Sequence, residues 1–310
     1  MTGTIIKSTG SWYTVLTKDG ERIDCRIKGK FRMEGIKTTN PLAVGDVVDF
    51  DMDTDKASGI ITTIHNRKNY IIRRSINLSK QTHIIAANMD MAYLVVTLAQ
   101  PRTSLGFIDR FLVTAEAYHI PATIIFNKVD IYTEEGLEEL KRLTDLYTKL
   151  GYSCFTLSAL RENDVAFLRD KMTNAVNLIS GHSGVGKSTL INSIEPSLSL
   201  KTAAVSEAHN KGIHTTTFAE MYPLKGGGFI IDTPGIKELG IVEIEKSELA
   251  HYFPEMEAIR HACKFSTCLH LTEPRCAVIA AVENGSIAES RYLTYYSIMN
   301  GDELVKKYQD

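Results

Sequence analysis

The chain has 310 residues, of which 44% are hydrophobic and 23% are charged. These values predict a globular protein of two or three domains, since a single core seldom grows beyond about 250 residues. No apolar run reaches the ~18 residues that a membrane span requires. The first residues, MTGTIIKSTGSW, lack the apolar core of a secretory signal, so we expect a cytoplasmic protein.

Charge is unevenly distributed, although the formal net charge is only −2. Residues 1–75 carry 13 Lys/Arg against 9 Asp/Glu, and the remaining residues carry 22 against 28. The basic stretch Arg26, Lys28, Lys30 and Arg32, with Phe31 among them, is able to pair phosphates and stack a nucleic-acid base. The alternative is a solvated edge strand whose lysines deter aggregation.

Residues 1–72 predict a small β-barrel. Ile23, Cys25 and Ile27 alternate with polar residues, which is the period of a half-buried strand, and Asp19-Gly20 suits the tight turn before it. Residues 44–50 and 59–64 indicate further strands. The length of this segment fits a five-stranded oligonucleotide-binding (OB) barrel, and it fits an SH3-like barrel nearly as well.

From residue 85 onward, apolar strand-like runs alternate with helical stretches. The clearest helix covers residues 134–150, and the strand-like runs cover residues 91–98, 122–126, 153–157, 176–179 and 229–231. This alternation predicts a mainly parallel sheet with helices on both faces. After residue 237 the sequence becomes helical again.

Two short motifs follow neighbouring strands of this sheet. The pattern NKxD, formed by Asn127, Lys128, Val129 and Asp130, comes directly after one strand, and Ser158-Ala159 ends the next. The Asp130 carboxylate is expected to accept hydrogen bonds from N1–H and the 2-amino group of guanine, a pair of donors that adenine lacks. Such a site discriminates by up to about 10⁴-fold. Asn127 and Lys128 are expected to fix the loop, and a backbone N–H at Ser158-Ala159 to hold the guanine oxygen.

A phosphate-binding loop of the pattern GxxxxGKS follows the strand at residues 176–179 and precedes a helix at residues 189–194. Its glycines let backbone N–H groups turn toward the phosphates, and the helix N-terminus adds favourable potential. Lys187 is expected to reach the β- and γ-phosphates, and Ser188 to bind Mg²⁺. The residues assigned to nucleotide binding in this loop are Gly181, His182, Ser183, Gly184, Val185, Gly186, Lys187, Ser188 and Thr189.

A third group of residues is expected to sense the γ-phosphate. In the sequence DTPG, Asp232 is expected to hold Mg²⁺ through water and the Gly235 N–H to contact the γ-phosphate. Thr216, in the polar segment 211–217, is expected to bind Mg²⁺ as part of a mobile switch. Ile236 stands where many GTPases place a water-orienting glutamine, which predicts slow intrinsic hydrolysis. His214 is either the water-positioning group or a structural switch residue. The residues assigned to catalysis are His214, Lys187, Thr216 and Asp232.

The order of these motifs is circularly permuted. NKxD precedes the phosphate loop here, whereas it follows that loop in the common GTPase arrangement. Ligands bind at the carboxyl ends of parallel strands, so adjacency in space makes the site and chain order does not. Because the γ-phosphate-sensing segment leads directly into the C-terminal region, we expect nucleotide state to be transmitted there.

Cys263, Cys268, His270 and Cys276 lie within fourteen residues of one another. Three thiolates and one imidazole form a closed tetrahedral site, which suits structural zinc and leaves no open position for catalysis. Disulfides are not expected in a reducing cytoplasm. The alternative is a set of buried cysteines near a core histidine.

The arrangement as a whole resembles the RsgA (YjeQ-type) family of GTPases. The resemblance rests on the permuted order of NKxD, Ser-Ala, GHSGVGKST, GIHTTT and DTPG between a front barrel and the Cys-x₄-Cys-x-His-x₅-Cys segment, and it covers nearly the whole chain. It implies a multidomain α/β protein: an OB-like RNA-binding barrel over residues 1–72, a circularly permuted P-loop GTPase domain over 73–237 and an α-helical zinc-binding domain over 238–310. Ile213 departs from the polar or basic residue that is usual before the histidine.

The same resemblance implies a ribosome-stimulated GTPase that acts late in small-subunit maturation and is released after hydrolysis. The expected cofactors are GTP or GDP, Mg²⁺ and one structural Zn²⁺. The expected partners are the small ribosomal subunit, its rRNA and other assembly factors, with the protein itself a monomer that does not contact membranes. Two alternatives stay open: a GTP-controlled RNA-binding module whose hydrolysis is incidental, and an ATP-using kinase, against which Asp130 argues.

Overall fold

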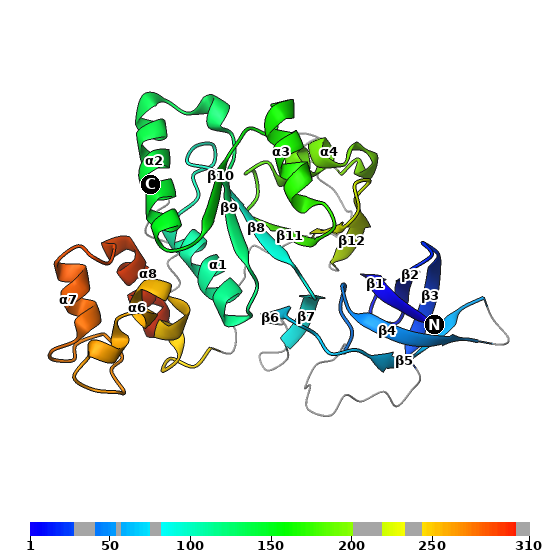
Figure 1. Cartoon of the computed structure of the whole chain (residues 1–310), viewed down its shortest axis with the longest axis horizontal. Coiled ribbons are helices and arrows are strands. Elements are labelled where there is room, and N and C mark those ends of the chain that lie inside the picture. Colours follow the sequence, from blue (N-terminus) through cyan, green and yellow to red (C-terminus); the bar gives the residue numbers. More distant parts are fainter. Residues whose placement is uncertain (28–40, 54–56, 75–81, 201–218, 233–243, 302–310) are drawn as a thin grey trace, which may run out of the picture.

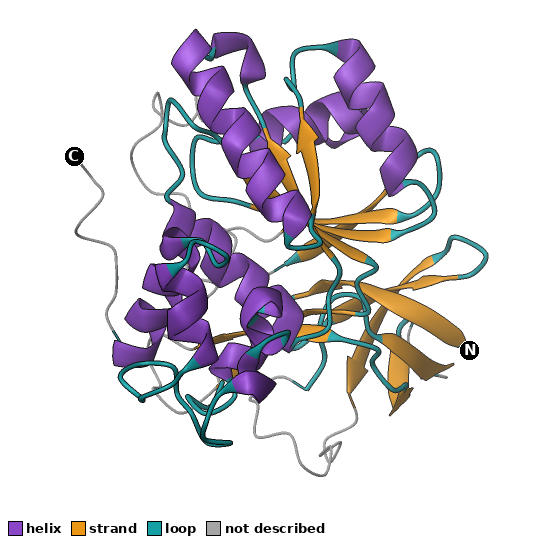
Figure 2. Ribbon diagram, turned by 60° about the vertical axis from the view of Figure 1, so that its left-hand side comes forward, coloured by secondary structure: helices purple, strands orange, loops and turns teal. Residues whose placement is uncertain are grey.

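The computed structural model describes residues 1–27, 41–53, 57–74, 82–200, 219–232 and 244–301, which form three parts (Figure 1). A strand barrel and a group of short C-terminal helices lie on different sides of a central sheet that helices cover. Figure 2 shows strands running from the helix-covered centre into the barrel. Among these described residues, no helix has both the length and the apolar character needed to cross a membrane.

The N-terminal part is a closed barrel of five strands. These are β1 (Thr2–Ser8), β2 (Tyr13–Thr17), β3 (Arg22–Ile27), β4 (Val47–Met52) and β5 (Gly59–Ile64). The pairing runs β1-β2-β3-β5-β4 and returns from β4 to β1, with β3 and β5 parallel. This order is that of an OB barrel and not of an SH3-like barrel, so the OB alternative is confirmed. The Asp19-Gly20 turn joins β2 to β3, and Gly20 has a φ of 85°.

Most of the basic stretch lies outside the described residues, which include Arg26 but not Lys28, Lys30, Phe31 or Arg32. Arg26 donates from Nη2 to Asp53 at 3.0 Å. The phosphate-pairing interpretation of this stretch therefore stays a prediction.

The central sheet has the order β10-β9-β8-β11-β13-β12, and all its strands are parallel except β12. Its strands are β8 (Met91–Val96), β9 (Ala122–Phe126), β10 (Ser153–Thr156), β11 (Val176–Ser180), β12 (Glu220–Pro223) and β13 (Phe229–Asp232). The helices that cover it are α1 (Leu105–Ala117), α2 (Glu134–Lys149), α3 (Glu162–Met172) and α4 (Lys187–Ile194).

Both faces of this sheet are buried. In β8, Leu94 and Val96 belong to the core that α1 and α2 complete, whereas Tyr93 and Val95 belong to the core that α3 and α4 complete. A strand buried on both faces has an unbroken run of apolar residues, which is why β8 showed no alternation in the sequence. The predicted parallel sheet with two helical layers is confirmed.

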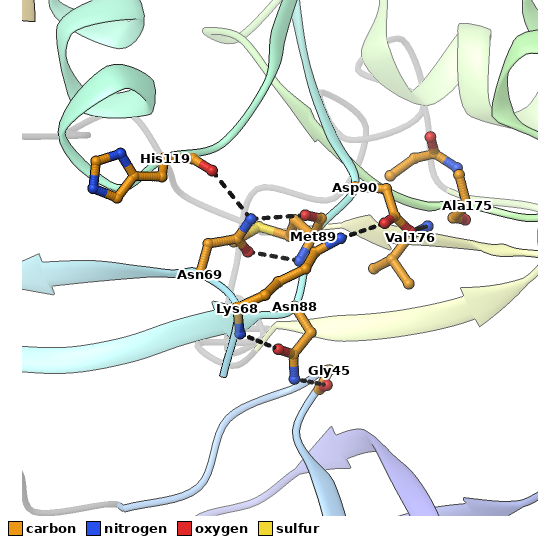
Figure 3. Close-up of polar contacts among 10 residues, drawn as sticks. Gly45, Lys68, Asn69, Asn88, Met89, Asp90, His119, Ala175 and Val176 are labelled. Carbon is orange, nitrogen blue, oxygen red and sulfur yellow. Dashed lines mark hydrogen bonds and ion pairs between the residues drawn. The ribbon is translucent and has the colours of Figure 1, made fainter. Parts of the chain in front are cut away.

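Two features join the barrel to the central sheet. The first is a strand pairing, since β1 is antiparallel to β12 and Lys7 forms an ion pair with Glu220 at 3.1 Å. The second is a polar joint around the hairpin of β6 (Tyr70–Arg74) and β7 (Thr82–Ala87), drawn in Figure 3.

Two asparagines organise this joint. The buried Asn69 amide donates to the Met89 carbonyl and accepts from the Met89 N–H, both at 2.8 Å. Asn88 donates to the Gly45 carbonyl of the barrel at 2.9 Å and accepts from the Lys68 N–H (Figure 3). These bonds satisfy the backbone groups where the barrel, the hairpin and β8 meet, so the joint is fixed rather than loosely hinged.

The C-terminal part contains a 3₁₀ turn (Leu249–Tyr252), α6 (Pro254–Glu257), a second 3₁₀ turn (Arg260–Ala262), α7 (Ala277–Glu283) and α8 (Glu289–Asn300). It contacts α1 through a fully buried ion pair, in which Arg291 donates to Asp109 at 2.8 Å. Arg291 also donates to Glu255 at 2.6 Å. Burial opposes the charge of Arg291, but the two carboxylates outweigh it and raise the pKa of Arg291 above its ordinary value.

Replacing Arg291 with methionine is expected to destabilise the protein by about 3–5 kcal/mol, because Asp109 and Glu255 would keep their buried charges without a partner. Thermal unfolding of the wild type and the variant measures this loss. The matched control is Arg142→Met, since the Arg142 side chain on α2 is exposed and the loss of its pair with the half-buried Glu139 is expected to cost less than about 1 kcal/mol. An equal effect of the two substitutions would contradict this account of the buried pair.

Candidate functional site

The predicted base-binding loop, Asn127–Asp130, lies at the carboxyl end of β9 and is tied to both neighbouring loops by Asn127. This side chain is buried, donates from Nδ2 to the Val185 carbonyl at 2.8 Å and accepts at Oδ1 from the Ala159 N–H at 3.0 Å. A methyl group on Gly186 would come within 2.5 Å of Asn127 Nδ2, so the loops meet at a position where only glycine fits. Asn127 thus joins three segments that the sequence separates by up to 58 residues.

Asp130 lies at the open edge of this loop, with its carboxylate exposed to solvent. A hydrogen bond from the Ser158 side chain lowers the pKa of Asp130 below its ordinary value. The backbone N–H of Ser158 in turn donates to Asp164 at 2.9 Å, which fixes the loop that follows β10. The predicted base-reading residues therefore lie together, and Asp130 is ionised and able to accept two hydrogen bonds.

The phosphate loop joins β11 to α4 and takes a backbone conformation that favours glycine. Gly181, Gly184 and Gly186 have φ values of 144°, 87° and 94°. Lys187 folds back over the loop and donates from Nζ to the carbonyls of Gly181 at 2.5 Å and His182 at 2.7 Å. The ammonium group is thus held over the loop, where an approaching phosphate would meet it.

Of the residues predicted to sense the γ-phosphate, the structure describes Asp232 alone. It ends β13 and is the register partner of Ile179 in β11, two residues before Gly181. Its carboxylate therefore belongs to the same edge of the sheet as the phosphate loop. His214, Thr216 and Gly235 lie outside the described residues, as do Ile213 and Ile236.

Sequence reasoning missed the loop between β8 and α1, which closes one side of this site. Lys128 Nζ donates to the Gln100 carbonyl of that loop at 2.6 Å. The Tyr132 hydroxyl bridges the two loops, because it donates to the Asn127 carbonyl at 2.7 Å and accepts from the Leu98 N–H at 2.9 Å. No residue pattern in the loop 97–104 indicates that it belongs to the site. The loop contacts the site mainly through backbone groups, and its partners are distant in the chain.

The four predicted metal ligands of the C-terminal part lie together, with all donor atoms within 4.8 Å of one another. Cys263 Sγ lies 3.8 Å from Cys276 Sγ and 3.6 Å from Nδ1 of His270. With Zn–S bonds of about 2.3 Å and Zn–N bonds of about 2.0 Å, a tetrahedron has S–S edges of roughly 3.8 Å and S–N edges of roughly 3.5 Å. The donor set and its spacing therefore fit a zinc ion.

The surroundings of these ligands also suit a metal. Backbone N–H groups donate to two of the sulfurs, from Ala277 to Cys263 at 3.3 Å and from Ile279 to Cys276 at 3.4 Å, as is common where thiolates bind metals. Burial lowers the pKa of His270, which favours the neutral imidazole that ligates zinc.

Two family models match the chain. The RsgA GTPase model matches residues 64–242, and the RsgA N-terminal domain model matches residues 2–61. The first covers more than half of the chain and includes each of the nucleotide-site residues described above.

Curated relatives match over nearly the full length. A protein of Flavobacterium johnsoniae named small ribosomal subunit biogenesis GTPase RsgA is 55% identical over 305 residues, which are 98% of this chain and 94% of that protein. A Bacteroides fragilis protein of the same name is 54% identical over 98% of this chain and 97% of its own length.

Two solved structures share the whole architecture. YjeQ from Thermotoga maritima has a TM-score of 0.77 and 35% identity, with 97% of this chain and 98% of that one covered. YloQ, described as a circularly permuted GTPase, has a TM-score of 0.74 and 32% identity, with 97% and 94% covered. Both likenesses extend over barrel, central sheet and C-terminal helices, so the three parts and the permuted order recur together.

Proposed function

The chain belongs to the RsgA family of GTPases, and on this premise we propose that it binds the small ribosomal subunit and hydrolyses GTP during the late maturation of that subunit. Hydrolysis is stimulated by the subunit and drives release of the factor. The cofactors that membership implies are a guanine nucleotide and Mg²⁺. Support for the subunit as partner comes from the names of the relatives.

The observation that carries this proposal is the double attachment of Asn127. The buried Asn127 amide of the loop suited to a purine donates to the Val185 carbonyl of the loop suited to phosphates at 2.8 Å. The same amide accepts from the Ala159 N–H at 3.0 Å. A single nucleotide can therefore contact both loops at once. The exposed Asp130 carboxylate makes the site select a guanine nucleotide over an adenine nucleotide.

We assign the roles of the site residues accordingly. Asn127–Asp130 and Ser158-Ala159 bind the base, and residues 181–189 bind the phosphates. Ser188 and Thr216 bind Mg²⁺, Asp232 holds it through water, and Gly235 contacts the γ-phosphate. Lys187 stabilises charge on the transferring phosphoryl group, and His214 positions the attacking water.

The remaining assignments concern the other two parts. We propose domains at 1–72, 73–237 and 238–310, the first binding rRNA and the last holding one structural zinc ion through Cys263, Cys268, His270 and Cys276. The protein acts as a monomer among other assembly factors. Its place of action is the cytoplasm, where small subunits mature.

GTP turnover measured with and without purified small subunits tests this function. We expect strong stimulation by the subunits for the wild type, and for Lys187→Ala a loss of about 10²- to 10³-fold, because the ammonium group that faces the developing phosphate charge is gone. Arg142→Met, on the exposed face of α2, is the control and should keep wild-type turnover. Equal turnover of Lys187→Ala and the wild type would refute the proposed site.

A second candidate function is a GTP-controlled RNA-binding module whose hydrolysis is incidental. The observation in its favour is Ile236, which follows DTPG and has no polar group to orient water. The same experiment separates the two candidates, since turnover that small subunits leave unchanged favours the module.

A further inference from the structure

The loop between β8 and α1, residues 97–104, lies against the phosphate loop as well as the base loop. A methyl group on Gly184 would lie 3.1 Å from Pro101 Cδ, so the two loops are in contact at this point. Thr103, only 2% exposed, faces His182 of the phosphate loop, with Thr103 Oγ1 2.7 Å from His182 Nε2. The Phe107 ring of α1 meets the same imidazole edge to face, with centroids 5.6 Å apart.

The hydrogen bonds around Thr103 determine which group donates. The Thr97 N–H donates to Thr103 Oγ1 at 3.1 Å, so the hydroxyl accepts there and its own proton is available to His182. His182 Nδ1 lies 3.0 Å from the Ser183 carbonyl, which only accepts, so Nδ1 carries the ring proton. Burial and the nearby Lys187 and Lys128 charges lower the pKa of His182, in agreement with a neutral ring whose Nε2 accepts from Thr103.

The backbone of His182 extends this series of hydrogen bonds to Lys187. Lys187 Nζ donates to the carbonyl of His182 and to that of Gly181. A shift of the His182 residue therefore moves one of the two carbonyls that hold the ammonium group. Thr103 itself has no described contact with Lys187, so it reaches that lysine through the imidazole.

We propose that Thr103 is a positioning residue for nucleotide binding: through His182 it fixes the phosphate loop in the conformation that holds Lys187 ready for the phosphates. The inference rests on the proposed function, because it takes the loop at 181–189 to bind guanine nucleotide. It extends the site to a residue outside every motif, in the loop directly before the Ser104 N-cap of α1, the helix that also carries Asp109.

The test is GDP affinity measured with a fluorescent GDP analogue on the full-length protein. Thr103→Val keeps the shape of the side chain but removes the hydroxyl. A buried acceptor on His182 then loses its donor, and the Thr97 N–H loses its acceptor. We expect about tenfold weaker binding. Thr103→Ser restores the hydroxyl and is expected to bind within about twofold of the wild type. Thr123→Val is the matched control, since Thr123 is equally buried but lies in β9 and donates only to the Met91 sulfur.

A double-mutant cycle separates positioning from general destabilisation. In a His182→Ala background, Thr103→Val should cost much less affinity than in the wild type, because the imidazole is already absent and only the Thr97 N–H loses a partner. His182→Ala alone should weaken binding about as much as Thr103→Val, which keeps the inference testable if the valine variant folds poorly.

Two results would overturn the inference: wild-type affinity in Thr103→Val, or an equal loss from Thr103→Val in the presence and absence of the imidazole. A wild-type protein that bound GDP no better than Lys187→Ala would instead refute the proposed function. The two failures are therefore distinguishable.

Discussion

Replacing Asp130 with asparagine is expected to lower the preference for GDP over ADP by up to about 10⁴-fold. The carboxylate offers two acceptors to N1–H and the 2-amino group of guanine, whereas an amide offers one acceptor and one donor. The amide donor would face the 2-amino donor, and neither group would be satisfied. Ser158 can still donate to the amide oxygen, so we expect the loop itself to keep its conformation.

The same substitution should create affinity for xanthine nucleotides. Xanthine carries a carbonyl at C2 in place of the amino group, so the amide donor meets an acceptor while N1–H still meets the amide oxygen. Competition of GDP, ADP and xanthosine diphosphate against a labelled nucleotide measures both effects.

The control for this experiment is Asp145→Asn, which makes the same change of charge at an exposed position on α2. It should leave all three affinities unchanged. If Asp130→Asn kept the wild-type order of GDP over ADP, Asp130 would not read the base.

Removing the proposed zinc ion is expected to unfold the segment around α7 and the start of α8. Structural zinc contributes about 10–16 kcal/mol of apparent binding energy in small zinc domains at neutral pH, which is as large as the whole stability of a typical domain. The other described supports of this loop are hydrogen bonds. The hydroxyls of Tyr292 and Tyr295 donate to the carbonyls of His270 and Leu269, and the Glu273 carboxylate accepts from three backbone N–H groups of the loop.

Hydrogen exchange after treatment with a zinc chelator measures this effect, and zinc content should be close to one ion per chain beforehand. We expect faster exchange over residues 263–299 and little change at β8, β9 and β11. Because the ligands must lose protons to bind, zinc affinity should fall as the pH is lowered.

Cys276→Ser should reproduce the chelator's effect and lose the zinc. Cys154→Ser removes a thiol in β10 outside the cluster and should keep the zinc content of the wild type. Unchanged exchange after complete removal of zinc would show that the C-terminal core and the Arg291 network suffice without the metal.

Element type was predictable where a local pattern dominated. β9 was expected and found at residues 122–126, and α2, expected over 134–150, runs over Glu134–Lys149, with Thr133 accepting from the Gly136 N–H at its N-terminus. Element ends were less predictable. β8 ends at Val96 and not at residue 98, because the Thr103 side chain accepts from the Thr97 N–H and turns the chain. α4 begins at Lys187 and not at residue 189, because Gly186 is the residue before the helix and the backbone is helical from Lys187 onward.

The sequence by itself determined where the candidate residues of the two sites lie along the chain and which chemistry they predict, because each motif joins particular residue types to a strand end, a turn or a short loop, and such relations are local. Spacing alone predicted the cysteine cluster for the same reason. Only the tertiary structure decided how the parts are joined: that Asn127 ties the base loop to the phosphate loop, that Thr103 faces His182, and that Arg291 pairs with an aspartate 182 residues away. A periodic pattern reports which face of an element is buried but not what that face meets, so contacts between distant buried polar groups leave no trace in the sequence.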